Sequence, residues 1–146
     1  MDCYSCRQNE NLDQLPIRER IAVDASWRTA HVLHSALPGW LVLLPRRHVT
    51  SLADLTEAEM ADLGGWQVRL ARALAAVTGC VKTYVALFAE AEGFSHVHFH
   101  IVPRMADQPD DRRGPAVFGY LNPPAGQAVT DEQQDELAAA LAAALA

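Results

Sequence analysis

Three histidines at every second position form the part of the sequence that is best suited to chemistry. They are His96, His98 and His100, half of the six histidines in the chain, and apolar residues stand between them. Successive side chains of a β-strand point to opposite faces, so this spacing predicts a strand with three imidazoles in one row. An ordinary solvent-exposed strand carries mixed polar residues. Three groups that titrate near neutral pH instead indicate metal binding, acid–base chemistry or a nucleophile.

A possible metal site begins at the start of the chain. Cys3 and Cys6 have the C-x-x-C spacing with which two thiolates can bind one zinc ion. Two further ligands must come from elsewhere, and the candidates are His48, directly after an expected strand, and one member of the histidine row. Neighbouring imidazoles along a strand lie roughly 6–7 Å apart, too far for all three to bind one ion easily. We therefore expect the histidines to have different roles. One binds the metal ion, the others face substrate, and a neutral imidazole among them acts as nucleophile.

The elements that must position these residues can be predicted from hydrophobic periodicity and turn residues. Short β-rich runs separated by turn residues indicate an antiparallel arrangement. The expected strands are residues 20–24, 27–33, 40–44, 81–89 and 94–104. The run 40–44 is apolar on both faces, which predicts a central strand covered on each side.

Two helices are expected. Thr56 and Glu59 have the spacing of a capping box, apolar residues then recur at threes and fours, and Gly79 supplies a stop, so a long helix should span about 57–77. The pair Gly64 and Gly65 within it indicates close packing, against another subunit in one interpretation and a slight bend in the other. A second capping box predicts a C-terminal helix over 130–145. Residues 1–19 are expected to be an N-terminal segment in which 3–19 form a loop with at most one short helical turn, and residues 105–126 are expected to be a loop.

Size and charge limit the classes of function. A chain of 146 residues with 50% hydrophobic residues fits one domain, residues 1–146. Its net charge of −6 argues against binding long nucleic acids, whereas a small anionic substrate can be held by a local cluster of donors. No stretch resembles a secretory signal or an apolar membrane span, so we expect a cytoplasmic protein without membrane contact.

The histidine row resembles the motif of the histidine-triad (HIT) superfamily of nucleotide hydrolases and transferases. That motif, His-φ-His-φ-His-φ-φ, is matched by residues 96–102, and Pro103-Arg104 is a common continuation. Cys3-x-x-Cys6 resembles the zinc half-site of bacterial members, and residues 40–48 resemble their strand that ends in Pro-Lys/Arg-x-His. The resemblance implies an α+β fold with a five-stranded antiparallel sheet, one long helix and a C-terminal helix. It also implies a homodimer paired through the long helix and a neighbouring strand.

The resemblance also implies a role for each site residue. His98 matches the nucleophile, which attacks the α-phosphorus of a small nucleotide substrate and forms a covalent nucleotidyl-histidine. His100 matches the third triad position and, with Ser95, is expected to bind substrate near the phosphate. The implied ligands of a structural zinc ion are Cys3, Cys6, His48 and His96.

Several substrate-binding residues of the family pattern are absent from this chain. An Asn and a Gly-Gln-Ser/Thr segment usually precede the triad, whereas residues 88–95 are shorter and acidic, with Glu90 and Glu92. The ribose-binding Asp is missing, and Trp40 replaces a frequent histidine. Two alternatives therefore stand beside the enzyme: a zinc-stabilised nucleotide-binding or scaffold module with weak or no catalysis, and a hydrolase that uses a catalytic metal on the histidine row.

Overall fold

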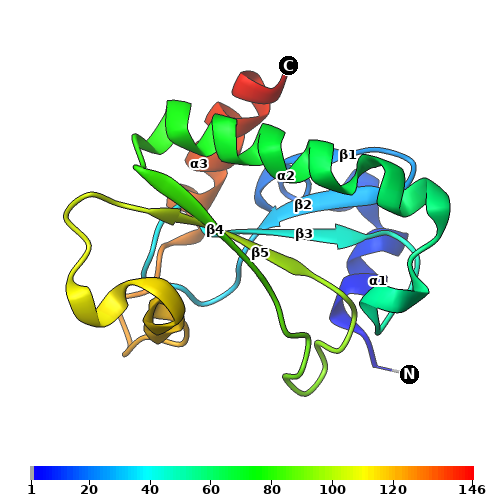
Figure 1. Cartoon of the computed structure of the whole chain (residues 1–146), viewed down its shortest axis with the longest axis horizontal. Coiled ribbons are helices and arrows are strands. Elements are labelled where there is room, and N and C mark those ends of the chain that lie inside the picture. Colours follow the sequence, from blue (N-terminus) through cyan, green and yellow to red (C-terminus); the bar gives the residue numbers. More distant parts are fainter. Residues whose placement is uncertain (1) are drawn as a thin grey trace.

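A five-stranded antiparallel sheet is the central element of the fold (Figure 1). The computed structural model describes residues 2–146. The strands are β1 (Ala22–Val23), β2 (Trp27–His31), β3 (Leu41–Pro45), β4 (Lys82–Leu87) and β5 (Phe99–Arg104). They lie in the order β1-β2-β3-β5-β4, so β5, the last strand in the sequence, is inserted between β3 and β4. The expected α+β class and the antiparallel sheet of five strands are confirmed.

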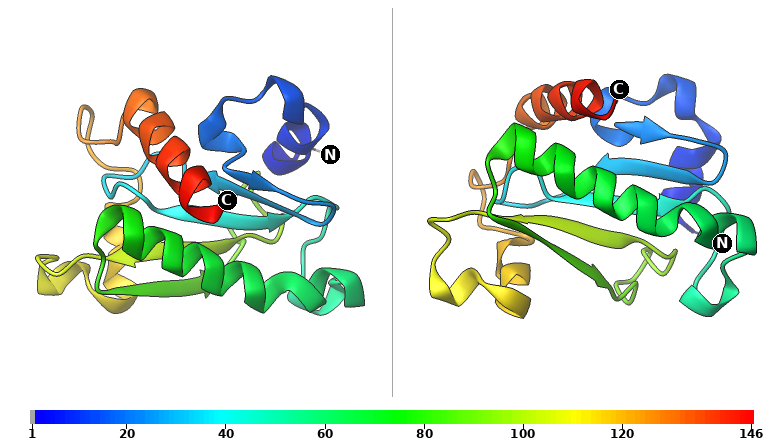
Figure 2. Two further views of the ribbon diagram at one scale, coloured as in Figure 1. Left: turned by 90° about the horizontal axis from the view of Figure 1, so that it is seen from above. Right: turned by 45° about the horizontal axis from the view of Figure 1, so that its top comes forward.

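Two long helices cover one face of this sheet (Figure 2). They are α2 (Glu57–Thr78) and α3 (Asp131–Leu145), and each begins with the capping box that the sequence predicts, at Thr56 and at Thr130. Gly79 ends α2 in the left-handed region, with φ of 73°, which glycine adopts without the steric cost of a side chain. The expected long helix and C-terminal helix are confirmed.

The main hydrophobic core lies between these helices and the sheet. Leu41 and Leu43 of β3 and Phe99 and Ile101 of β5 face it, and all four are buried. Leucines from both helices complete the core: Leu70, Leu74 and Leu141. Because side chains alternate along a strand, the even-numbered residues of β5 must face the opposite side of the sheet. His100 therefore lies on the face that the two long helices leave open.

Shorter segments frame that second face (Figure 1). At one end lies α1 (Tyr4–Glu10), and at the other lies a 3₁₀ segment, Gly114–Tyr120. A second hydrophobic cluster anchors the 3₁₀ segment to the sheet through Leu37, Trp40, Val102 and Val117. The two segments leave the middle of this face uncovered.

Three expectations about secondary structure differ from the fold. Residues 3–19 were expected to form a loop with at most one short helical turn, but they contain the seven-residue helix α1, whose amino end is capped by the Cys3 side chain. The loop 105–126 contains two short 3₁₀ segments, Asp110–Arg112 and Gly114–Tyr120. The histidine strand begins at Phe99, not at residue 94. Its lead-in leaves the ladder because the Val97 N–H donates to the Val49 carbonyl, 2.7 Å away.

The glycine pair in α2 is not in close packing with the rest of the chain. Gly64 and Gly65 are exposed, and a Cβ added to either would meet nothing within 4 Å. Within residues 2–146, none of the helices has the length and hydropathy needed to cross a membrane.

Candidate active site and metal cluster

Four side chains from three separate segments meet in a metal-binding arrangement. They are Cys3, Cys6, His48 and His96, and one ligand atom of each lies within 4.8 Å of all the others. The Nδ1 atom of His96 is 3.6 Å from both sulfur atoms, and Nδ1 of His48 is 3.2 Å from the Cys6 sulfur. Tetrahedral zinc with bonds of about 2.0–2.3 Å would separate its ligand atoms by roughly 3.3–3.8 Å. The donor set and its spacing fit a structural zinc ion, as the sequence predicts.

The second nitrogen of His96 fixes how that ring is presented. Its Nε2 lies 2.7 Å from the Pro45 carbonyl oxygen, which can only accept, so Nε2 carries the proton. The lone pair is then on Nδ1, which faces the two sulfurs. A hydrogen bond of this kind is the usual way in which a protein orients a metal-ligating imidazole. His96 is completely buried in the cluster and does not line the cavity described below.

The pKa of Cys6 makes metal binding at the cluster dependent on pH. Burial, followed by the hydrogen bond and charge of Cys3, raises the pKa of Cys6 to about 11. Without a cation Cys6 is therefore a thiol at neutral pH. Zinc binds thiolate, so loading the site must release protons, and its affinity must rise with pH.

A cavity of about 520 Å³ lies on the open face of the sheet. Ala30, Val42 and Leu44 of β2 and β3 line it, together with His98 and His100. Its other lining residues come from segments far apart in the sequence: Tyr4, Ser5 and Glu19; Arg28 and His31 to His34; Phe88 to Ala91 and Phe94; and Phe118, Leu121 and Asn122. A cavity of this volume suits a small organic ligand. Tyr4 and Ser5 belong to α1, the helix that contains Cys6 and is capped by Cys3.

A backbone carbonyl selects the tautomer of neutral His98, which lines this cavity. Its Nδ1 lies 2.8 Å from the backbone carbonyl oxygen of His96, and because a carbonyl only accepts, Nδ1 carries the proton in the neutral ring. The lone pair is then on Nε2. His98 is half-buried and lines the cavity, so this nitrogen is available to an electrophile there.

His100 lies deeper and beside His98. Their ring centroids are 4.9 Å apart and nearly perpendicular, and the Trp40 indole N–H donates to His100 Nδ1 at 3.0 Å. Burial, with a smaller contribution from His98, lowers the pKa of His100 to about 4. The ring is therefore neutral at pH 7.

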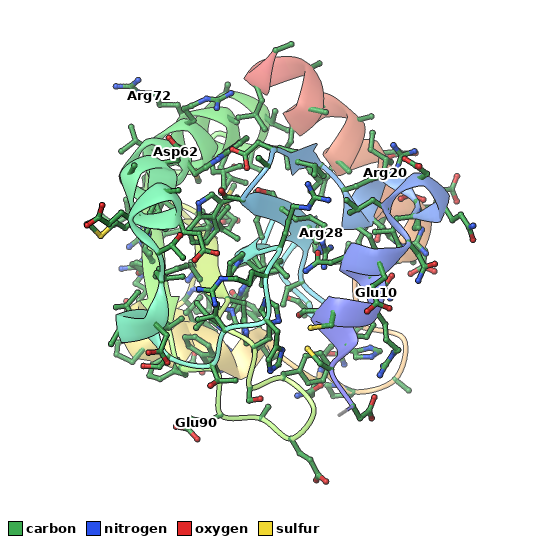
Figure 3. All side chains as sticks on the ribbon, turned by 90° about the vertical axis from the view of Figure 1, so that its right-hand side faces the viewer. Glu10, Arg20, Arg28, Asp62, Arg72 and Glu90 are labelled. Atoms are coloured by element: carbon green, nitrogen blue, oxygen red, sulfur yellow. The ribbon has the colours of Figure 1, made fainter. Side chains whose placement is uncertain are left out.

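A buried ion pair, which the sequence did not point to, joins α1 to the cavity. Arg28 is 1% exposed, and its guanidinium donates to the side chain of Asn9 at 2.7 Å and to the Glu19 backbone carbonyl at 2.6 Å. The Glu19 carboxylate lies 3.4 Å from the guanidinium and accepts from the Tyr4 hydroxyl at 2.9 Å. Burial, then Glu19, raises the pKa of Tyr4 to about 12, so this hydroxyl stays a donor. Figure 3 shows Arg28 between α1 and the sheet.

Left-handed backbone gathers around the same cavity. The three residues other than glycine with positive φ among those described are His34, Ala89 and Asn122, at 51°, 54° and 52°. All three line the cavity. Such conformations cost of order 1 kcal/mol each and persist where the surrounding structure enforces them, which occurs most often at ligand sites.

The remaining candidate residues from the sequence lie in different surroundings. Ser95 is exposed and is not among the residues that line the cavity. Glu90 lines the rim, and its exposed side chain lies at the outer margin of the molecule in Figure 3, whereas Glu92 is exposed away from the cavity. His31 is buried, and its two nitrogens form hydrogen bonds with the Val32 carbonyl and the Gly39 N–H. It therefore stabilises the connection between β2 and β3.

The α+β fold and its three alternating histidines, of which His96 joins the cysteine–histidine cluster and His98 and His100 line the cavity, define a histidine-triad protein. Comparison with protein families agrees. The sequence model of the HIT domain matches residues 20–107, more than half of the chain, so the chain belongs to the HIT domain family. Membership implies, in general, a function of the nucleotide hydrolase or transferase type with small nucleotide ligands.

Solved structures share this fold. A zinc-bound histidine triad family protein from Mycobacterium smegmatis is 21% identical, with a TM-score of 0.69 over 99% of this chain and 94% of that one. A histidine triad protein from Bradyrhizobium japonicum is 26% identical, with a TM-score of 0.67 over 84% and 86%. A hypothetical histidine triad nucleotide-binding protein from Sulfolobus tokodaii is 14% identical, with a TM-score of 0.72 over 98% and 91%. A search of curated proteins finds no match.

Proposed function

We propose that this protein is a nucleotide hydrolase or nucleotidyl transferase that acts at the α-phosphate of a nucleoside phosphate derivative. The observation that carries the proposal is the orientation of His98. Its Nδ1–H is held by the His96 carbonyl at 2.8 Å, which leaves the Nε2 lone pair facing a cavity large enough for a nucleotide.

In the proposed reaction, Nε2 of His98 attacks the α-phosphorus. A phosphorus–nitrogen bond forms as the bond to the leaving group breaks, and the leaving group departs with that electron pair and takes a proton from solvent. The His96 carbonyl stabilises the positive charge that develops on the imidazole by accepting the Nδ1–H hydrogen bond. Water or another acceptor then attacks phosphorus and loses a proton to solvent as the phosphorus–nitrogen bond breaks. The electron pair of that bond returns to Nε2, so His98 becomes neutral and the nucleotide is released. His100 contacts the phosphate oxygens.

The metal has a structural part in this proposal. Zinc on the cysteine–histidine cluster would have four protein ligands and no open position, and would therefore tie α1 to the sheet. The similar protein from Mycobacterium smegmatis is zinc-bound, which supports zinc as the ion. His98 and His100 do not belong to the metal-binding group found among residues 2–146, which counts against a catalytic metal on the histidine row.

Intact-mass measurement tests the enzyme proposal. The zinc-loaded protein is incubated with an adenosine phosphoramidate or a dinucleoside polyphosphate, and the analogous substrates with other bases follow. A nucleotidyl adduct that maps to His98, and turnover that His98→Ala abolishes, are expected. Glu92→Ala is a control because Glu92 is exposed and does not line the cavity. Neither adduct nor turnover with any base would contradict the proposal.

A nucleotide-binding module with little or no catalysis is the second candidate. Two observations favour it: Ser95 is exposed outside the cavity, and the acidic Glu90 lies on its rim. Calorimetric titration with nucleoside monophosphates separates the two candidates. Affinity for a nucleotide without turnover dependent on His98 would favour the module.

We also propose that a second copy of the chain covers the exposed face of α2 and β4. β4 is an edge strand, and four large apolar side chains on or beside these two elements are more than 45% exposed: Met60, Val68, Val81 and Val85. The open space at Gly64 leaves room for the partner helix. Native mass spectrometry should give a dimer, and Val68→Asp a monomer, whereas Val23→Asp on β1 should stay dimeric. A wild-type monomer at micromolar concentration would refute this arrangement.

A further inference from the structure

Trp40 makes a buried hydrogen bond to a triad histidine. It lies directly before β3, is completely buried, and its indole Nε1–H donates to Nδ1 of His100 over 3.0 Å. His100 is 7% exposed, so water has little access to this bond. Both partners are held in place by Phe118, whose ring lies edge-on 5.2 Å from Trp40 and 5.0 Å from His100.

The chemistry of the indole decides the protonation of its partner. An indole N–H can only donate, so the nitrogen it reaches must have a free lone pair. In a neutral imidazole the other nitrogen then carries the proton. A doubly protonated ring would place two N–H groups against each other, which agrees with the low pKa of His100. His100 is therefore the Nε2–H tautomer.

This assignment makes the two cavity histidines complementary. His98 has its proton on Nδ1 and its lone pair on Nε2, whereas His100 has the reverse. Since Nδ1 of His100 is occupied by Trp40, Nε2 is the nitrogen left for the cavity that His100 lines. The cavity thus receives one acceptor nitrogen and one N–H donor from rings whose centroids are 4.9 Å apart.

We propose that Trp40 is a positioning residue that locks His100 as an Nε2–H donor for an anionic oxygen of the ligand. His100 then supports the phosphate as a hydrogen-bond donor and takes no proton from it. The identity of that anion as a nucleotide phosphate rests on the proposed function, but the tautomer does not. A histidine at position 40 could donate or accept, whereas tryptophan leaves one choice.

Nitrogen NMR of the zinc-loaded protein tests the lock without any ligand or turnover. In protein labelled with ¹⁵N, His100 at pH 7 should show a pyridine-like Nδ1 and a pyrrole-like Nε2. A coupling between Trp40 Nε1 and His100 Nδ1 through the hydrogen bond is also expected. In Trp40→Phe, which keeps an aromatic ring but removes the donor, the two nitrogen shifts should move toward each other as the tautomers mix. A proton on Nδ1 in the wild type, or unchanged shifts in Trp40→Phe, would overturn the lock.

Equilibrium binding of adenosine monophosphate tests the donor role. The amide nitrogen of glutamine can stand in for an imidazole Nε2–H, so His100→Gln should bind within a few-fold of the wild type. His100→Leu should bind about 10-fold more weakly or worse, because a hydrogen bond to a charged ligand is lost. Equal affinity of the two variants would refute the donor role. If no nucleotide binds to the wild type, the proposed function and the donor role both fail, while the NMR result still decides the tautomer.

Discussion

The buried pair of Arg28 and Glu19 gives the sharpest stability prediction. Arg28→Met keeps much of the side-chain volume but removes the hydrogen bonds to Asn9 and to the Glu19 backbone. It also removes the cation beside the Glu19 carboxylate, and Glu19 is a buried residue, only 7% exposed. Removing one partner of a buried ion pair costs about 3–5 kcal/mol. Tyr4 still donates to the Glu19 carboxylate, so we expect the lower end, about 3 kcal/mol. The melting temperature should fall by roughly 6–12 °C.

A double-mutant cycle in urea separates the pair from simple loss of packing. Glu19→Gln alone leaves Arg28 as an uncompensated buried charge, whereas Arg28→Met combined with Glu19→Gln removes both charges. The double variant should therefore be more stable than the sum of the single losses predicts, by at least about 1 kcal/mol. Coupling below about 0.5 kcal/mol would refute the reasoning. Asp110→Asn breaks an ion pair with Arg113 at the surface and should cost less than about 1 kcal/mol.

Three further predictions concern the metal, pH and the core. Removing zinc with a chelator, or Cys6→Ser, should lower the melting temperature and speed amide hydrogen exchange in α1, whereas Cys80→Ser outside the cluster should leave the exchange in α1 unchanged. Burial lowers the pKa of His100 from 6.5 to about 4, so the unfolded chain binds its proton first as pH falls. This group should therefore cost about 3 kcal/mol of stability between pH 6.5 and 4, a loss absent from His100→Gln in urea titrations at both pH values. Leu70→Ala, at a fully buried position, should cost about 2–5 kcal/mol by the same assay, and less than about 1 kcal/mol would contradict the packing described.

Elements with strong local signals were predicted well from the sequence. The two capping boxes and Gly79 placed α2 and α3 nearly to the residue because these signals act within one turn of the helix. The strands of the sheet also followed from short β-rich runs. By contrast, α1 has seven residues and little apolar periodicity, and its cap is a cysteine, so the sequence gives no helix signal there.

At the site, the sequence predicted residue types better than contacts. The cluster of Cys3, Cys6, His48 and His96 forms as expected, although His96 lies in a bend before β5 and not within the strand. Arg28 was one residue of an expected strand, and only the fold shows that its charge meets Glu19. Such pairings between distant segments are set by tertiary packing, and the periodicity of the sequence does not reveal them. The roles of His98, His100 and Ser95 stay predictions.

The separation of the metal ligands along the chain has a consequence for biosynthesis. Cys3 is translated well before His96, its partner 93 residues later in the sequence. Until then α1, short and without its anchors, has little to keep it helical. The α1 segment should therefore pack late, after β3 and the lead-in to β5 have come together. A nascent chain would expose two free thiols during that interval, when they are most open to oxidation.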